Sequence, residues 1–427
     1  MSADPAQRTD IAAAAAWVAA RLAEAGPIEV RTIATAGNPV VYGEWLGAPG
    51  APTLLVYGHY DVQPAAPLDQ WLSLPFQPEV RSGRLYGRGV SDNKGPMLIP
   101  IKVAQAFFAT RGALPLNVKF LFEGEEEIGS RNLAPCIAAN APLLQANCVL
   151  SADGAMWRSD EPSITIACRG VAALEFSIRG ANRNLHSGRY GGSVPNALHA
   201  LAELVASLHT PDGQVAVAGF YDAVATVPAG ERAEIAALPF EEERFLAAVG
   251  ARATVGEAGY STLERQWIRP TLELNGMWGG YLGQGSQTVT PNEAHAKISC
   301  RLVPDQDPDA IRGLVIRHLE THLPAGVALS VSGEQHGALP YRIPADHPGL
   351  LTAERVLAEV YGTAPLRVRM GSTLPVSALF KRALGLETVF FSFSTTDEDF
   401  HAPNEFFRVT RLHEGLRAWA RYWDCYR

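Results

Sequence analysis

The chain has 427 residues, of which 47% are hydrophobic and 19% charged, and its formal net charge at pH 7 is −8. This length and composition predict two or three domain-sized units with a substantial core. The acidic balance excludes a nucleic-acid-binding protein, which needs a basic surface. No apolar stretch of the sequence is long enough for a membrane span, so neither nucleic acid nor a membrane is an expected partner.

The five cysteines are odd in number and widely spaced, and no two of them form a CxxC pair. This usage predicts a reducing compartment and excludes a thiolate metal site. The Ala-rich run over 11–25 has the look of a signal peptide, but Asp10, Arg21 and Glu24 flank or interrupt it, which favours an amphipathic surface helix. We therefore expect a cytoplasmic protein.

Four short apolar runs each end at polar side chains suited to chemistry. The runs cover 53–58, 118–122, 149–152 and 389–393, and helical patterns such as 97–110 separate them. Buried strands that alternate with helices predict a mostly parallel sheet in an α/β domain. Ligands of such sheets bind beyond the carboxyl ends of the strands, where all four polar clusters would lie.

The middle of the chain predicts a second domain, of the split βαβ (ferredoxin-like) α+β kind. Its expected elements are a pair of strands over 164–179, a helix over 194–208, strands over 271–279 and 294–303, a helix over 309–323 and a strand over 327–332. The segment 212–264 is predicted to be an insertion, helical near 241–249. We therefore predict a catalytic domain in two parts, residues 1–167 and 337–427, with residues 168–336 inserted between them.

The first two motifs lie at 58–62 (GHYDV) and 87–95 (GRGVSDNKG). On an extended segment residues i and i+2 point to the same side, so Asp61 can hydrogen-bond one ring nitrogen of His59 while the other binds a metal. The pair also fits an ordinary polar contact. Glycines in the second motif let the backbone bring Asp92, whose carboxylate can bridge two cations, into a crowded site. The alternative for Asp92 is a helix cap.

The run over 123–130 (EGEEEIGS) places four glutamates at the end of an apolar strand. Exposed runs of this kind are normally solvated, but here a buried strand leads into the run. Glu126 and Glu127 would point in different directions, so that one binds a metal while the other acts as a general base on a metal-bound water. Glu123 and Glu125 are expected to be solvated or structural.

Two further motifs complete the set of possible ligands. Asp153 follows the strand over 149–152, and His401 lies in the segment 397–405 beyond the strand over 389–393. Each also fits an ordinary turn or cap. Jointly the five motifs supply two histidines and three carboxylates, the nitrogen and oxygen donors that suit a pair of divalent cations.

These five motifs, in this order and over nearly the whole chain, resemble the co-catalytic di-zinc metallopeptidases that include aminoacylase, acetylornithine deacetylase, succinyl-diaminopimelate desuccinylase and the carnosinase-like cytosolic dipeptidases. The resemblance implies a phosphorylase/hydrolase-like catalytic domain and an inserted lid and dimerisation domain. It implies two divalent metal ions per chain, zinc by default, with manganese or cobalt as alternatives. His59, Asp92 and Asp153 would hold one metal, and Asp92, Glu127 and His401 the other.

The resemblance also implies roles for side chains around the metals. Glu126 would deprotonate a water polarised by both metals and later protonate the leaving amine, and Asp61 would orient His59. In the segment 184–188, His186 resembles a histidine that reaches across a homodimer to stabilise the oxyanion in the partner's site. A surface histidine on a Gly-rich loop is the structural alternative.

Four residues are expected to bind the carboxylate of the substrate. Arg301 resembles the family's arginine that makes a bidentate contact to this group, and Thr288 would assist it. Backbone N–H groups at Gly371 and Ser372, which precede a predicted helix, would hold the same carboxylate. Arg301 and Ser372 also fit ordinary structural roles.

Within this family the amino-acid sequences of the segments 58–64, 186–192 and 219–222 resemble those of the dipeptidases. We therefore predict a metallodipeptidase or related carboxypeptidase that acts on small peptides with a free carboxylate. The enzyme alternative is an N-acyl-amino-acid deacylase with the same metal centre. A catalytically inactive binding relative would have lost a ligand or the base, and none is missing. The family usually has a further helix before residue 2, which we expect this chain to lack.

Overall fold

The computed structural model describes residues 1–332 and 337–427, which form two compact units. The first unit contains Met1–Ala167, Ile343–Arg369 and Pro375–Arg427, and the second contains Cys168–Arg342 and Met370–Leu374. The predicted boundary between residues 336 and 337 lies at the end of the segment 333–336, which is outside the described residues. Within the described part of the chain, none of the helices combines the length and apolar character that crossing a membrane requires.

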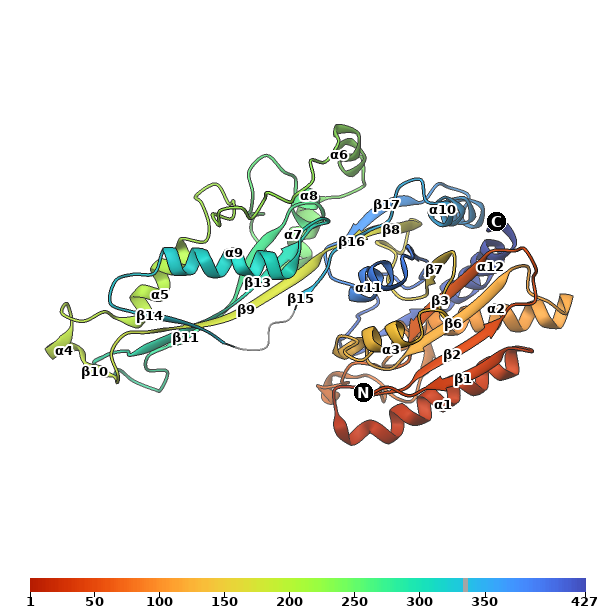
Figure 1. Ribbon diagram of the computed structural model, residues 1–427, viewed down its shortest axis with the longest axis horizontal. Coiled ribbons are helices and arrows are strands. Elements are labelled where there is room, and N and C mark those ends of the chain that lie inside the picture. The colour runs from red at the N-terminus through yellow and green to blue at the C-terminus, as the bar shows by residue number, and fades with distance from the viewer. Residues whose placement is uncertain (333–336) are drawn as a thin grey trace. The chain divides into compact units, whose positions relative to one another are not determined.

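A six-stranded sheet forms the centre of the first unit (Figure 1). Its strands, in spatial order, are β1 (Glu29–Ile33), β2 (Val40–Trp45), β6 (Asn117–Glu123), β3 (Thr53–His59), β7 (Cys148–Ser151) and β18 (Thr388–Phe390). The last four of these run parallel, and β1 and β2 are antiparallel to their neighbours. The predicted mostly parallel α/β domain is therefore confirmed, although the run over 389–393 contributes a shorter strand than expected.

The continuous apolar runs reflect burial of the strands on both faces. In β3 every residue from Leu54 to His59 is buried, and β6 has the same pattern. On one face Tyr57 packs edge-on against Phe380, with ring centroids 5.5 Å apart. On the other face Phe120 meets Trp423, with centroids 6.4 Å apart. Because helices cover both faces of the sheet, polar and apolar residues do not alternate along these strands.

The helices of the first unit pack in these two layers. They are α1 (Arg8–Ala25), α2 (Lys94–Arg111), α3 (Leu133–Ala139), α10 (Pro348–Tyr361), α11 (Pro375–Leu384) and α12 (Val409–Cys425), with 3-10 turns η1 (Pro5–Gln7), η2 (Leu68–Gln70) and η3 (Glu126–Ile128). The predicted amphipathic helix over 11–25 is part of α1, which buries residues at spacings of three and four. Smaller strands complete the unit: β4 (Glu79–Arg81), β5 (Arg84–Tyr86) and β19 (Phe406–Arg408) form one sheet, and β8 (Ser163–Cys168) pairs with β17 (Leu366–Met370).

The second unit is built around an antiparallel sheet of the order β11-β13-β9-β14. Its elements follow the chain as β9 (Gly170–Arg179), α5 (Ala197–Ala206), β11 (Thr271–Gly279), β13 (Glu293–Leu302), α9 (Pro308–Thr321) and β14 (Ala328–Ser332). This is the β-α-β-β-α-β order predicted from the sequence, and the split βαβ class is confirmed. The remaining elements are β10 (Leu185–His186), α4 (Ser187–Tyr190), α6 (Ala229–Ala236), α7 (Glu242–Val249), α8 (Thr262–Trp267), β12 (Val289–Thr290), β15 (Gly337–Ala338) and β16 (Tyr341–Arg342).

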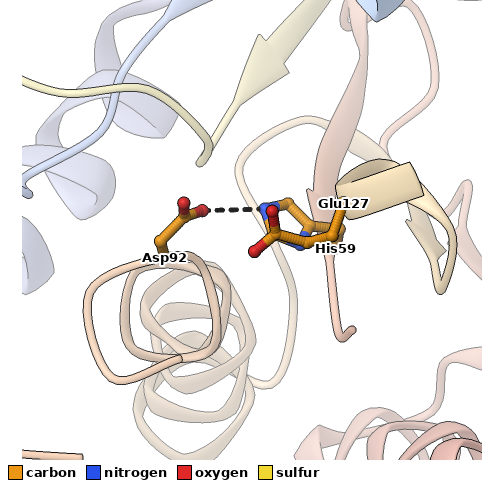
Figure 2. A group of neighbouring side chains, drawn as sticks. All are labelled: His59, Asp92 and Glu127. Atoms are coloured by element: carbon orange, nitrogen blue, oxygen red, sulfur yellow. Dashed lines mark hydrogen bonds and ion pairs between the residues drawn. The ribbon is translucent and has the colours of Figure 1, made fainter. Parts of the chain in front are cut away.

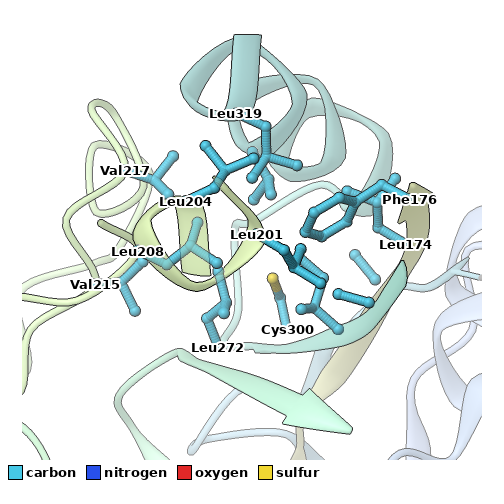
Figure 3. Close-up of a cluster of buried hydrophobic side chains, with 14 of the residues drawn as sticks. Leu174, Phe176, Leu201, Leu204, Leu208, Val215, Val217, Leu272, Cys300 and Leu319 are labelled. Atoms are coloured by element: carbon cyan, nitrogen blue, oxygen red, sulfur yellow. The ribbon is translucent and has the colours of Figure 1, made fainter. Parts of the chain in front are cut away.

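The core of the second unit lies between one face of this sheet and the helices α5 and α9 (Figure 3). Phe176 from β9, Leu201 and Leu204 from α5 and Leu319 from α9 meet there. Burial alternates along β9 and β13, because successive side chains of a strand point to opposite faces. Arg301 therefore lies on the face of the sheet that the helices leave uncovered.

Candidate active site

His59 is the last residue of β3, and its ring is completely buried. Its Nε2 atom lies 3.0 Å from Oδ1 of Asp92 (Figure 2). Its Nδ1 atom lies 3.3 Å from the backbone oxygen of Asp61 and 3.5 Å from the Oδ1 atom of the same residue. The ring is thus oriented by Asp61 on one side and presents its other nitrogen to Asp92.

Asp92 lies between two imidazole rings. Its Oδ1 atom is 3.0 Å from Nε2 of His59, and its Oδ2 atom is 3.0 Å from Nε2 of His401. The same nitrogen of His401 lies 3.1 Å from Oε2 of Glu127. Ligand atoms of His59, Asp92 and Glu127 all lie within 4.8 Å of one another. A carboxylate that directs one oxygen to each of two histidines has the arrangement expected of a bridging ligand.

Asp153, which follows β7, extends the cluster on the His59 side. Its Oδ1 atom lies 3.9 Å from Nε2 of His59, and its own backbone is turned by a 2.6 Å hydrogen bond from the N–H of Gly154 to the carboxylate. Burial, together with the nearby charge of Asp92, raises the pKa of Asp153 to about 6, against the lowering effect of His59. The structure thus gathers all five predicted metal ligands within the first unit.

The carboxylates of this cluster raise the pKa values of both candidate histidine ligands. Burial by itself lowers the pKa of His59, but the carboxylates of Asp61 and Asp92 hold it well above its ordinary value. Hydrogen bonds to Asp92 and Glu127 raise the pKa of His401 to about 10. The raised pKa values of the two imidazoles indicate that the surrounding carboxylates favour positive charge at these positions. Neutral imidazole and carboxylate are also the donors that zinc, manganese and cobalt accept, so the residues fit a pair of divalent cations.

Glu126 begins the 3-10 turn η3, next to the candidate ligand Glu127. Within residues 1–332 and 337–427 its carboxylate accepts no hydrogen bond. Burial, together with the charges of Asp153 and Asp92, raises its pKa well above the ordinary value for a glutamate, although His59 acts in the opposite direction. A carboxylate with free lone pairs and a raised pKa is suited to accept and return a proton.

The other two glutamates of the run over 123–130 are buried and structural, so the solvated alternative is wrong for both. Glu123 accepts hydrogen bonds from the hydroxyls of Tyr57 (2.7 Å) and Ser130 (2.9 Å). Glu125 accepts one from the backbone N–H of Asn38 (2.9 Å). These bonds restrain the loop on both sides of Glu126, so two of the four glutamates in the run support the backbone.

Glu405 is a supporting residue that sequence reasoning missed. It is completely buried, and its Oε1 atom accepts the backbone N–H groups of Ser91 (2.9 Å) and Asp92 (3.0 Å). Its Oε2 atom accepts the backbone N–H of Gly89 (2.9 Å) and a 2.8 Å ion pair from Arg88. Its place four residues after His401, in the segment 397–405, was the available signal. Glu405 thus lies in the same segment as His401 and holds the loop that carries Asp92.

The His401 loop is held in an uncommon conformation. His401 has a φ of 61°, in the left-handed region that residues other than glycine rarely adopt. A 3.1 Å hydrogen bond from Arg88 to the carbonyl of Ala402 restrains the loop. Gln63 acts similarly on Glu127, donating from its backbone to Oε1 (3.2 Å) and from its side chain to Oε2 (2.9 Å). The sequence alone predicted neither the contact of Arg88 with Ala402 nor that of Gln63 with Glu127.

The remaining predicted residues belong to the second unit and form two groups. Arg301 donates a 3.1 Å hydrogen bond to Oγ1 of Thr373, next to Gly371 and Ser372. His186 is exposed at the end of β10, and the carbonyl of Thr288 accepts the N–H of the next residue, Ser187, at 3.0 Å.

These two groups lie at opposite ends of the sheet. Arg301 pairs with Val171 and Glu293 pairs with Arg179, so eight residues of strand, roughly 27 Å, separate the two ends. The structure therefore groups Thr288 with His186 and not with Arg301.

The sequence matches the model of Peptidase family M20/M25/M40 over residues 55–424. It is 30% identical over 390 residues to a Cys-Gly metallodipeptidase of Schizosaccharomyces pombe, covering 90% of this chain and 82% of that protein. It is 30% identical over 388 residues to the Beta-Ala-His dipeptidase of Homo sapiens, covering 90% and 76%. An M20 family metallo-carboxypeptidase from Sulfolobus solfataricus superimposes with a TM-score of 0.84 at 29% identity, covering 96% and 93%. The chain therefore belongs to peptidase family M20/M25/M40.

Proposed function

We propose that the chain is a metal-dependent dipeptidase that hydrolyses the amide bond of small peptides with a free carboxylate. The observation that carries this proposal is the position of Asp92 between His59 and His401. The carboxylate of Glu126, which accepts no hydrogen bond from the described residues, interacts electrostatically with His59 and Asp92. Two of the relatives are named as dipeptidases, one for Cys-Gly and one for Beta-Ala-His.

Two divalent cations per chain are part of the proposal. His59, Asp92 and Asp153 would hold one, and Asp92, Glu127 and His401 the other, with zinc as the default and manganese or cobalt as alternatives. When bound, such cations lower the pKa of water and polarise a carbonyl oxygen. Glu126 takes the proton of the attacking water and returns it to the leaving amine. Asp61 contacts both the ring of His59 and the backbone N–H of Glu126, and so fixes the position of one relative to the other.

Carboxylate recognition is assigned to the second unit. Arg301, with the N–H groups of Gly371 and Ser372, would bind the free carboxylate of the substrate, because a fixed guanidinium and backbone donors together suit this planar anion. N-acyl amino acids carry the same carboxylate beside the same kind of amide. The metal site therefore suits either class, and hydrolysis of a substrate panel that contains both separates them.

A homodimer completes the proposed site. His186 and Thr288 lie together at the end of the sheet remote from Arg301, so we assign them to the site of a partner subunit, where His186 would stabilise the oxyanion. Chains that carry His186→Ala and chains that carry Glu126→Gln should each be inactive. A verified heterodimer of the two has one intact site of its two and should regain up to about half of wild-type activity, and a randomly assorted mixture about a quarter. Inactivity of that mixed dimer would count against a role in trans. We also propose a cytoplasmic location, which the cysteine usage supports.

The test of the proposed reaction is hydrolysis of a panel of dipeptides, their C-terminal amides and N-acyl amino acids, before and after chelation. Dipeptide cleavage that chelation abolishes and added metal restores supports the proposal. Preferred cleavage of the acyl amino acids would replace it with a deacylase on the same site. Metal-bound protein that cleaves neither class would contradict both.

A further inference from the structure

Arg169 lies between β8 and β9 and binds three consecutive carbonyl groups of one loop. Its backbone N–H donates to the carbonyls of Met370 (3.2 Å) and Ser372 (3.1 Å). Its Nε atom donates to the carbonyl of Gly371 at 2.9 Å. All of these residues belong to the second unit. A single residue therefore satisfies the acceptors of the loop over 370–372.

The donors of the same loop are left unused. Within the described part of the chain, no hydrogen bond is made by the backbone N–H of Gly371, Ser372 or Thr373. The side-chain oxygen of Thr373 accepts the 3.1 Å hydrogen bond from Arg301. A loop whose carbonyls are bound and whose N–H groups are free can offer several donors to one anion.

Positive charge is concentrated beside this loop. Burial, together with the neighbouring charge of Arg301, lowers the pKa of Arg169 to about 10, and Glu273 offsets part of this effect. The Nη1 atom of Arg169 is buried and has no hydrogen-bond partner in the described residues. Two neighbouring guanidinium groups, one with an unused donor, are stabilised when an anion binds between or beside them.

We propose that Arg169 is a positioning residue for the carboxylate of the substrate. By holding the carbonyls of residues 370–372, it leaves the N–H groups of Gly371 and Ser372 and the guanidinium of Arg301 to bind the anion. This inference rests on the proposed function, which assigns the carboxylate to Arg301 and this loop. The affinity for a free carboxylate then depends on a residue that lies 202 positions before Gly371 in the sequence and need not touch the scissile bond.

The experiment compares Arg169→Met, which removes both the charge and the donor to Gly371, with Arg169→Lys, which keeps a cation and a donor. Arg265→Met is the matched control, because Arg265 also binds backbone carbonyls of the second unit, those of Glu257 (3.0 Å) and Val255 (3.3 Å). Circular dichroism and metal content verify that each variant is folded and loaded. The readouts are KM and kcat for a dipeptide, and binding of N-acetylglycine and N-acetylglycinamide by calorimetry.

For Arg169→Met we expect a rise of about tenfold or more in KM for the dipeptide, a kcat within about threefold of wild type, and a similar loss of N-acetylglycine binding. Binding of N-acetylglycinamide should stay unchanged, Arg169→Lys should recover much of the loss, and Arg265→Met should behave as wild type. Equal losses for the acid and the amide, or no loss for the acid, would overturn the inference. Failure of the wild-type chain to cleave any dipeptide would instead overturn the proposed function, and the two failures are therefore distinguishable.

Discussion

The Oδ1 atom of Asp61 accepts a 3.2 Å hydrogen bond from the backbone N–H of Glu126. Its Oδ2 atom accepts another of 3.2 Å from the backbone N–H of Glu127, and the same carboxylate lies 3.5 Å from Nδ1 of His59. One buried side chain therefore connects a candidate ligand at the end of β3 to the turn that carries the candidate base and a second ligand. The proposed metal binding and the proposed proton transfer would both depend on this side chain.

Asp61→Asn keeps the size of the side chain but replaces one acceptor oxygen by a donor group. The N–H of Glu126 or Glu127 would then face an amide nitrogen, and His59 would lose a charged partner. Because such supporting contacts typically contribute 10- to 100-fold, we expect metal affinity and kcat to fall by about that factor together. Metal titration and steady-state kinetics check this, and a loss in only one of the two quantities would separate the roles assigned to Asp61.

Glu126→Gln should leave metal binding intact and lower kcat by roughly 10²- to 10⁴-fold, because the variant cannot accept a proton. Glu125→Gln is the matched control in the same run, since Glu125 is hydrogen-bonded to Asn38 and Asn132 and has no assigned chemical role. The control should keep kcat and lose about 1–3 kcal/mol in the free energy of unfolding. Normal turnover by Glu126→Gln would remove Glu126 as the base.

Glu405→Gln tests how the Asp92 loop is supported. The change replaces a buried carboxylate that accepts three backbone N–H groups and pairs with Arg88. Leaving the Arg88 charge unpaired should lower the free energy of unfolding of the metal-free protein by roughly 3 kcal/mol, measured by urea denaturation. Metal affinity should fall as well, because Asp92 loses its backbone restraint. A variant with wild-type stability would show that the ion pair contributes little.

Metal binding should depend on pH, because cations replace protons in the cluster. The pKa of His401 is raised to about 10 by its hydrogen bonds to Asp92 and Glu127, so this ring is protonated at pH 7 until a metal displaces the proton. Affinity should therefore rise with pH, by about tenfold per unit for each proton released. Calorimetry in buffers of different ionisation enthalpy counts these protons. A metal affinity that does not change between pH 6 and pH 8 would contradict the assignment.

The same raised pKa has the opposite consequence for the metal-free fold. A histidine whose folded pKa lies above its unfolded value stabilises the fold fully below the unfolded pKa, near 6.5. This contribution is lost as the pH rises through about 10. Alkaline pH should thus favour metal loading while it weakens the metal-free protein, and unfolding curves with and without metal should diverge above neutral pH.

The sequence predicted those parts of the fold that depend on local pattern. Continuous apolar runs predicted the buried strands β3, β6 and β7, and the β-α-β-β-α-β order predicted the class of the second unit. The positions of His59, Asp92 and His401 at loop and strand ends followed from the same reasoning. These features are readable because hydrophobic period and strand order are properties of neighbouring residues.

The supporting contacts were beyond this reasoning, because each depends on a pairing of distant segments. Glu405 binds the backbone of Asp92 from 313 residues away, and Arg169 binds the carbonyl of Gly371 from 202 residues away. Arg169 has no neighbours in the sequence that distinguish it from an ordinary surface charge, and the place of Glu405 near His401 does not say which backbone groups it binds. Thr288 was grouped with Arg301 for want of a strand register, and the pairing of β13 with β9 places the two at opposite ends of the sheet.

We propose that one cluster, joined by Asp92, holds the two divalent cations that the reaction requires. Metal content per chain, measured while activity on a dipeptide is restored by stepwise addition of zinc to the chelated protein, tests it most directly. We expect full activity at about two metals per chain, and loss of both metal and activity in Asp92→Asn. Full activity without metal, or two metals retained by an active Asp92→Asn variant, would contradict it.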